Sequence, residues 1–82
     1  MAGEIRLTLH DGEGLTIAGE DVQHVYENLW RLAPKPGAVS LAAAIRGLMG
    51  RSNVTRAPLD LTANQSATLR EAMAMLDENR ER

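Results

Sequence analysis

The sequence contains no cysteine and no phenylalanine, and it has one tryptophan and one tyrosine. Without cysteine, the chain has no disulfide, no thiolate metal ligand and no thiol nucleophile. Small secreted domains commonly carry disulfides, so their absence favours a reducing compartment, and we predict a cytoplasmic protein. With Tyr26 and Trp30 as the only aromatic residues, the core has to be built from Leu, Ile, Val, Met and Ala.

Long apolar runs are also missing, and none approaches the ~20 residues that span a bilayer. The start of the chain, Met1 to Glu4, lacks the basic-then-apolar order of a signal peptide. We therefore predict no membrane partner. The 82 residues fit a single domain, 1–82, with residues 1–4 and 79–82 frayed. A chain this short buries only about 60–65% of its unfolded surface, so its core is thin.

Negative charge is missing from the middle of the chain. Five of the nine basic residues and none of the eleven acidic residues lie between Arg31 and Arg56, although the net charge is −2. An overall negative charge argues against a general nucleic-acid binder. The acid-free segment predicts either pairing between parts of the chain or a basic surface for an acidic partner.

Apolar and polar residues alternate in two short stretches near the N-terminus, residues 5–9 and 15–17. Alternation of this kind is typical of strands with one buried face. The intervening run 11–14, Asp-Gly-Glu-Gly, predicts a tight turn, so we expect a β-hairpin.

Two helices are predicted in the middle of the chain. The first runs from Glu20 to Ala33 along a helical apolar stripe and ends at the prolines that follow it. The second is expected to begin at Ser40 as N-cap and to end near Gly50. The apolar side of the second helix is formed by Leu41, Ala44, Ile45 and Leu48.

A short third strand at residues 59–61 is followed by the run 62–65, Thr-Ala-Asn-Gln, which matches a capping box. A third helix is therefore predicted from Ala63 to Glu78, with one apolar stripe. We expect an α+β fold of order β-β-α-α-β-α, with a small three-stranded mixed sheet and helices mainly on one face. The predicted core comprises Leu7, Leu9, Leu15, Ile17, Val25, Leu29, Ile45, Leu48, Leu59, Leu61, Leu69, Met73 and Leu76.

A faint internal similarity relates the strand–helix unit at 15–32 to the unit at 59–76. Strand–helix units tend to place their strands in parallel, and a parallel second and third strand would require a right-handed crossover. The similarity has two explanations. One is a duplication, and the other is that any two strand–helix units have the same spacing of apolar residues.

No catalytic constellation emerges from the sequence. His10 and His24 fall on polar faces, the serines lack a nucleophile-elbow context, and the spacing of the histidines matches no common metal site. We predict no enzyme, no cofactor and no metal. A small enzyme would require one of these imidazoles to lie beside a carboxylate in a cleft.

The leading functional hypothesis is a non-catalytic protein-binding or regulatory module, either a homodimer or an accessory subunit of a larger assembly. Trp30 falls at the edge of the first helical stripe and Met75 falls well off the stripe of the third helix. Trp and Met side chains in such positions are typical of interfaces, and arginines supply a basic rim. The predicted partner is a second copy or a larger protein with an acidic surface. The residues predicted to bind it are Trp30, Arg46, Met49, Arg51, Arg56 and Met75.

The alternative is a small DNA-binding regulator. Residues 41–57 loosely resemble a helix-turn-helix, with residues 48–50 as the turn and Arg51 and Arg56 facing DNA. Pro58 would limit the second helix of this motif to about one and a half turns. The segment between Arg51 and Arg56 is compatible with either a loop or a short helix.

Overall fold

The computed structural model describes residues 4–49 and 59–80, and all statements about structure refer to these residues. Three strands form one sheet in the order β2-β1-β3. Strand β1 (Ile5–Thr8) lies in the centre, antiparallel to β2 (Gly14–Ile17) and parallel to β3 (Leu59–Asp60). The three-stranded mixed sheet predicted from the alternating residues is therefore confirmed.

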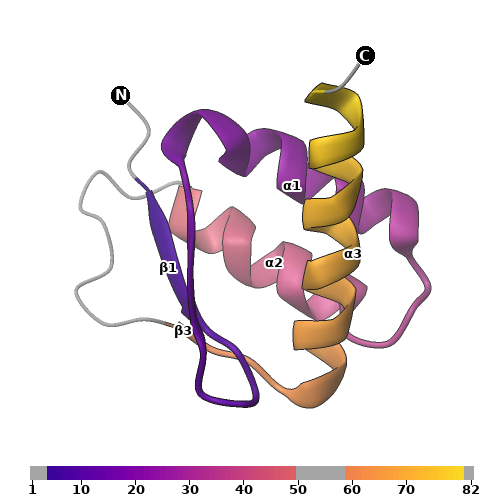
Figure 1. Cartoon of the computed structure of the whole chain (residues 1–82). Coiled ribbons are helices and arrows are strands. Elements are labelled where there is room, and N and C mark those ends of the chain that lie inside the picture. Colours follow the sequence, from indigo (N-terminus) through magenta and orange to yellow (C-terminus); the bar gives the residue numbers. More distant parts are fainter. Residues whose placement is uncertain (1–3, 50–58, 81–82) are drawn as a thin grey trace.

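Three helices lie on one side of this sheet (Figure 1). A short 3-10 turn, Gly19–Asp21, leads into α1 (Val22–Leu32), which is followed by α2 (Ala38–Met49) and α3 (Ala63–Arg80). The element order is β-β-α-α-β-α, as predicted. Helix α3 extends two residues beyond its predicted end at Glu78.

Residues 10–12 form the turn between β1 and β2, and Leu9 and Glu13 form the pair that closes it. The turn depends on one glycine, Gly12. The Leu9 carbonyl accepts a hydrogen bond from Gly12 N–H at 2.9 Å, and Leu9 N–H donates to the Glu13 carbonyl at 2.8 Å. Gly12 has a φ of 91°, a conformation that side chains with a Cβ disfavour. A three-residue loop that ends in a left-handed glycine is a common hairpin geometry, and it fixes the pairing of Ile5 with Ile17.

The two strand–helix units do not have the parallel arrangement that their similarity suggested. Strands β2 and β3 occupy opposite edges of the sheet, and they run antiparallel because both pair with β1 in opposite senses. The right-handed crossover was expected only if the second and third strands were parallel, so that expectation does not apply. The parallel neighbour of β3 is β1, which the hairpin places between the two edges.

Helix α2 starts earlier than the sequence predicted, so the assignment of Ser40 as N-cap is wrong. The helix begins at Ala38, directly after Gly37, whose carbonyl accepts from Leu41 N–H. Ser40 lies in the first turn, where its hydroxyl donates to the Gly37 carbonyl. Gly37 has a φ of 85°, and a Cβ placed on it would lie 2.7 Å from the backbone nitrogen of Gln65. The close approach of α3, rather than a side-chain cap, thus sets this helix end.

The start of α3 follows its sequence signature. Gln65 N–H donates to Thr62 Oγ1, and Thr62 N–H donates to Gln65 Oε1, at 3.2 and 3.0 Å. These reciprocal bonds form the predicted capping box. The side chain of Gln65 also donates to Ser40 Oγ, which ties the start of α3 to α2.

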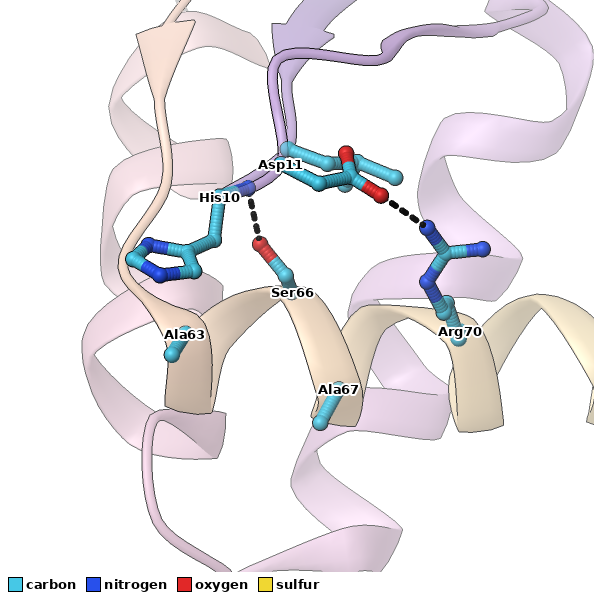
Figure 2. Close-up of a pocket in the computed structure, with 7 residues that line it drawn as sticks. His10, Asp11, Ala63, Ser66, Ala67 and Arg70 are labelled. Atoms are coloured by element: carbon cyan, nitrogen blue, oxygen red, sulfur yellow. Dashed lines mark hydrogen bonds and ion pairs between the residues drawn. The ribbon is translucent and has the colours of Figure 1, made fainter.

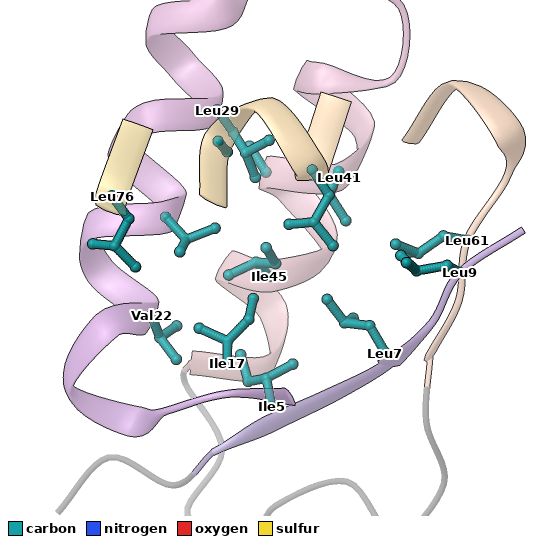
Figure 3. Close-up of a cluster of buried hydrophobic side chains, with 14 residues drawn as sticks. Ile5, Leu7, Leu9, Ile17, Val22, Leu29, Leu41, Ile45, Leu61 and Leu76 are labelled. Atoms are coloured by element: carbon teal, nitrogen blue, oxygen red, sulfur yellow. The ribbon is translucent and has the colours of Figure 1, made fainter. Parts of the chain in front are cut away.

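The core lies between the sheet and the helices (Figure 3). Nine of the thirteen predicted core positions are buried, and Leu15, Leu48, Leu59 and Met73 are partly buried against them. The predicted core omitted Ile5, Val22 and Leu41, all of which are buried. It also omitted Ala42 and Ala72, because alanines at close helix contacts carry little apolar signal on their own. The buried cluster consists of Ile5, Leu7, Leu9, Ile17, Val22, Val25, Leu29, Leu41, Ala42, Ile45, Leu61, Leu69, Ala72 and Leu76.

Two buried polar side chains hold α3 against the rest of the helical layer. Asn28 on α1 is 3% exposed, and its Nδ2 donates to the Ala72 carbonyl at 3.1 Å. Thr68 is 5% exposed, and its hydroxyl donates to the Pro36 carbonyl at 2.7 Å. Buried polar groups need such partners, so both bonds specify how α3 is placed. We call the contact of Pro36 and Gly37 with α3 the α3 junction.

Candidate binding surfaces

The most exposed large apolar side chains of the described residues lie at one end of the α1–α2 pair. Trp30 is 47% exposed near the C-terminal end of α1, and Val39 is 49% exposed at the start of α2. The short connection 33–37 joins these two helix ends, so both residues lie at the same end of the pair. Sequence analysis identified Trp30 as a residue at the edge of the apolar stripe, and the structure leaves it exposed.

The Trp30 ring is supported by a second aromatic ring. Tyr26, one helical turn earlier, packs edge-on against it with ring centroids 6.3 Å apart and an interplanar angle of 82°. Tyr26 is itself partly buried against the core cluster. This edge-to-face arrangement is a favoured aromatic geometry, so it restricts the indole without burying it.

Val39 and Arg46 are both exposed on α2. The two residues are seven positions apart, which places them on one stripe of a helix with 3.6 residues per turn. Arg46 is exposed, and it belongs to the acid-free segment of the chain. We call Tyr26, Trp30, Val39 and Arg46 the α1–α2 surface.

Sequence analysis missed Val39 because of the error in the start of α2. With Ser40 as N-cap, Val39 falls outside the helix, and its apolar side chain has no stripe to join. Counting back seven positions from Arg46 would have found it, provided that the helix had been assigned from Ala38.

Met75 does not belong to the same surface as Trp30. Asn28 bonds to Ala72, so the side of α1 that carries Asn28 faces α3. Trp30 follows Asn28 by two positions and lies about 160° round the helix axis from it at 100° per residue. Met75, one turn after Ala72, is half-buried on α3. The two side chains thus lie on different sides of α1.

The remaining predicted binding residues are at or beyond the limit of the described chain. Met49 is the last residue of α2, and its side chain is not among those described. Arg51 and Arg56 lie outside the described residues, as does the second half of the helix-turn-helix segment. Residues 48 and 49 are helical, so the part of the predicted turn that the structure describes continues α2 instead.

A second feature is a shallow hollow of about 240 Å³ between the hairpin turn and α3 (Figure 2). Its centre is held by a hydrogen bond of 2.8 Å from His10 N–H to Ser66 Oγ. At its rim, Arg70 Nη2 lies 3.4 Å from Asp11 Oδ2 and 3.5 Å from Glu13 Oε2. The lining residues are Leu9, His10, Asp11, Ala63, Ser66, Ala67 and Arg70.

The hollow does not pair the imidazole with a carboxylate. In Figure 2, the ring of His10 and the carboxylate of Asp11 point to opposite sides of Ser66. The other oxygen of Asp11 accepts from Glu13 N–H, so both carboxylate oxygens face hairpin or arginine donors. The second imidazole, that of His24, is exposed on α1. This geometry does not supply the oriented imidazole that an acid–base pair requires.

Metal-ligating residues do not converge within residues 4–49 and 59–80. No group of three or more His, Asp or Glu side chains in this part of the chain is arranged to hold an ion. In the same residues, every helix is too short or too polar to cross a lipid bilayer.

Comparisons with known proteins add no identification. Neither the known protein families nor the curated proteins nor the solved structures include a significant match to this chain. Functional reasoning therefore rests on the surfaces described above.

Proposed function

We propose that the protein is a non-catalytic protein-binding module that docks a partner on the α1–α2 surface. The observation that carries this proposal is the exposed indole of Trp30, 47% accessible and supported by Tyr26. Tryptophan is strongly enriched among the residues that dominate binding energies at interfaces. A ring that is already oriented loses little conformational freedom when a partner covers it.

The charge around this surface favours a partner with acidic groups. Arg46 lies on the stripe of Val39, and Arg31 is exposed beside Trp30 in the sequence. Glu27, three residues before Trp30, is exposed too and accepts a hydrogen bond from Gln23, so two arginines and one carboxylate lie in this region. A rim of arginines round an apolar centre is a common interface pattern, in which the charges mainly select the partner.

We further propose that the module is an accessory or regulatory subunit in the cytoplasm. The absence of cysteine supports a reducing compartment, and the thin core supports stabilisation by a partner.

The test compares two surface variants as baits in a native-host extract. Wild type and Met75→Ala are expected to capture the same protein, whereas Trp30→Ala loses it. With that partner purified, Trp30→Ala should weaken the affinity by about 30-fold, the effect of a hot spot of about 2 kcal/mol. Thermal unfolding of both variants checks the fold. Equal affinity of Trp30→Ala and wild type for the purified partner would refute the proposal.

DNA binding through residues 41–57 is the second candidate, and the exposed Arg46 in an acid-free segment is the observation that favours it. It predicts that Arg51→Ala plus Arg56→Ala folds normally but loses duplex binding. Binding should also fall steeply with salt, because phosphate contacts release counterions. A lack of duplex binding at low salt would eliminate this candidate.

A further inference from the structure

Strand β2 presents unpaired backbone groups along the outer edge of the sheet. In an antiparallel ladder, hydrogen-bonded and non-hydrogen-bonded residue pairs alternate. Leu9 N–H donates to the Glu13 carbonyl, so Leu9 and Glu13 form a hydrogen-bonded pair. Every second pair along the ladder is then hydrogen-bonded as well, which includes Leu7 with Leu15 and Ile5 with Ile17. The N–H and C=O groups of Gly14 and Thr16 therefore point away from β1.

Nothing among the described residues covers this edge. Strand β2 is the last strand of the sheet on its side, and both Gly14 and Thr16 are exposed. A Cβ placed on Gly14 would meet no atom within 4 Å. The edge also lacks the proline, lysine or bulge within the strand by which proteins commonly prevent strand addition. It is thus an open template for another strand.

We propose that β2 pairs with β2 of a second copy, antiparallel, with Leu15 on the two-fold axis. Gly14 of one copy then faces Thr16 of the other, and each such pair exchanges two hydrogen bonds. The two pairs satisfy the four N–H and C=O sites that each copy presents at Gly14 and Thr16. The result is a continuous six-stranded sheet built from two identical halves.

The neighbouring register, centred on Thr16, uses these groups less well. It would pair Gly14 of one copy with Ala18 of the other. The Ala18 carbonyl already accepts a hydrogen bond of 2.8 Å from Asp21 N–H. The register centred on Leu15 avoids this competition, so it is the one we assign.

Side chains agree with a second copy as the occupant. Leu15 is only partly buried, and on the axis it would meet the same residue of the partner on the helix-covered side of the sheet. The Glu13 residues of the two copies would be four positions apart along the ribbon, about 13 Å, so their like charges are separated. The strand is therefore complementary to itself in hydrogen bonds and apolar contact, and the pairing brings no like charges together.

The absence of natural cysteine makes the register directly testable. In the proposed pairing, Leu15→Cys places two thiols opposite each other across the axis, within the Cα separation of a disulfide. Mild oxidation should convert this variant to a covalent dimer. Thr16→Cys is the matched control, because its thiol is more exposed but lies opposite Gly14 of the other copy. Equal or preferential cross-linking through Thr16→Cys, or none through Leu15→Cys, would overturn the proposal.

Amide exchange of the wild-type chain provides an independent measurement. The amides of Gly14 and Thr16 should become protected as protein concentration rises, in step with the dimer fraction from sedimentation. The amides of Leu15 and Ile17 should be protected at every concentration, because they bond to β1. If Gly14 and Thr16 exchange at the same rate at all concentrations, the edge pairing does not occur.

Thr16→Pro separates this contact from the proposed docking surface. Proline removes an N–H that faces the free edge, so the β1–β2 ladder should survive while the dimer is lost. Trp30→Ala should leave the dimer intact. A dimer that survives Thr16→Pro but not Trp30→Ala would place self-association on the α1–α2 surface and refute the edge contact.

Discussion

The α1–α2 connection and the β1–β2 turn make the same demand on the backbone but have different surroundings. Each contains one glycine with a positive φ, 85° at Gly37 and 91° at Gly12. A Cβ on Gly37 would lie 2.7 Å from the Gln65 nitrogen, whereas a Cβ on Gly12 would meet nothing within 4 Å. The first link is enclosed by α3, and the second is open to solvent. Local conformation is thus the same, while the tertiary constraint differs.

The largest expected difference comes from replacing these two glycines. Gly37→Ala combines a left-handed alanine with a backbone clash, so it should lower the free energy of unfolding by about 2–5 kcal/mol. Gly12→Ala carries only the conformational term, about 1–2 kcal/mol. Urea denaturation of both variants measures the difference. Equal losses would show that α3 does not enclose the connection as tightly as its contacts indicate.

A smaller difference is expected from two threonine-to-valine changes. Thr68→Val removes the hydroxyl that bonds to the Pro36 carbonyl in the α3 junction, and it should cost about 1–3 kcal/mol. Thr16→Val changes an exposed strand residue and should alter stability by no more than about 0.5 kcal/mol. Thermal unfolding separates the two cases. If Thr68→Val left the stability unchanged, the bond to Pro36 would not hold α3 in place.

The smallest effects are expected at the exposed ion pairs of the two regions. Lys35 Nζ lies 2.6 Å from Glu71 Oε2 near the α3 junction, and both side chains are about half exposed, 50% and 48%. The Arg70 contacts to the hairpin are longer, at 3.4 and 3.5 Å. Double-mutant cycles should give about 0.5 kcal/mol or less for each pair, decreasing with salt. A coupling energy above about 1 kcal/mol for the Lys35–Glu71 pair alone would show that ion pairs near the α3 junction are stronger than other exposed pairs.

The Lys35–Glu71 pair also bears on the uneven charge distribution of the chain. Lys35 belongs to the acid-free segment, and Glu71 belongs to the acidic remainder. One of the two predicted uses of this segment, pairing within the chain, is therefore observed at this position. The ion pairs found within residues 4–49 and 59–80 do not include Arg46, which is exposed and so stays available for the other use.

Several predictions from the sequence succeeded because their causes are local. The hairpin followed from alternation and a glycine in the turn, and the start of α3 followed from Thr62 and Gln65, which bond to each other's backbone. The predicted start of α2 was wrong because its cause is not local. Ser40 is a good N-cap by type, but the helix end is set by Gly37 beneath α3, a contact from 28 residues further along the chain.

The candidate surfaces show the same division. Sequence periodicity placed Trp30 at the edge of its stripe, and the structure leaves it exposed. Periodicity did not separate Trp30 from Met75, because a stripe on one helix does not say which neighbour each side faces. The bond from Asn28 to Ala72 decides this.

By itself, the sequence determined the element order, the alternation that gives the sheet one apolar face, and the caps and turn that delimit several elements. These features depend on residues within one turn or one strand of each other. Only the tertiary structure decided that β1 is central, that β2 forms a free edge, and that Trp30 and Met75 lie on different sides of α1. Each of these depends on which distant segment occupies the adjacent space, and that choice is made by packing of the whole chain.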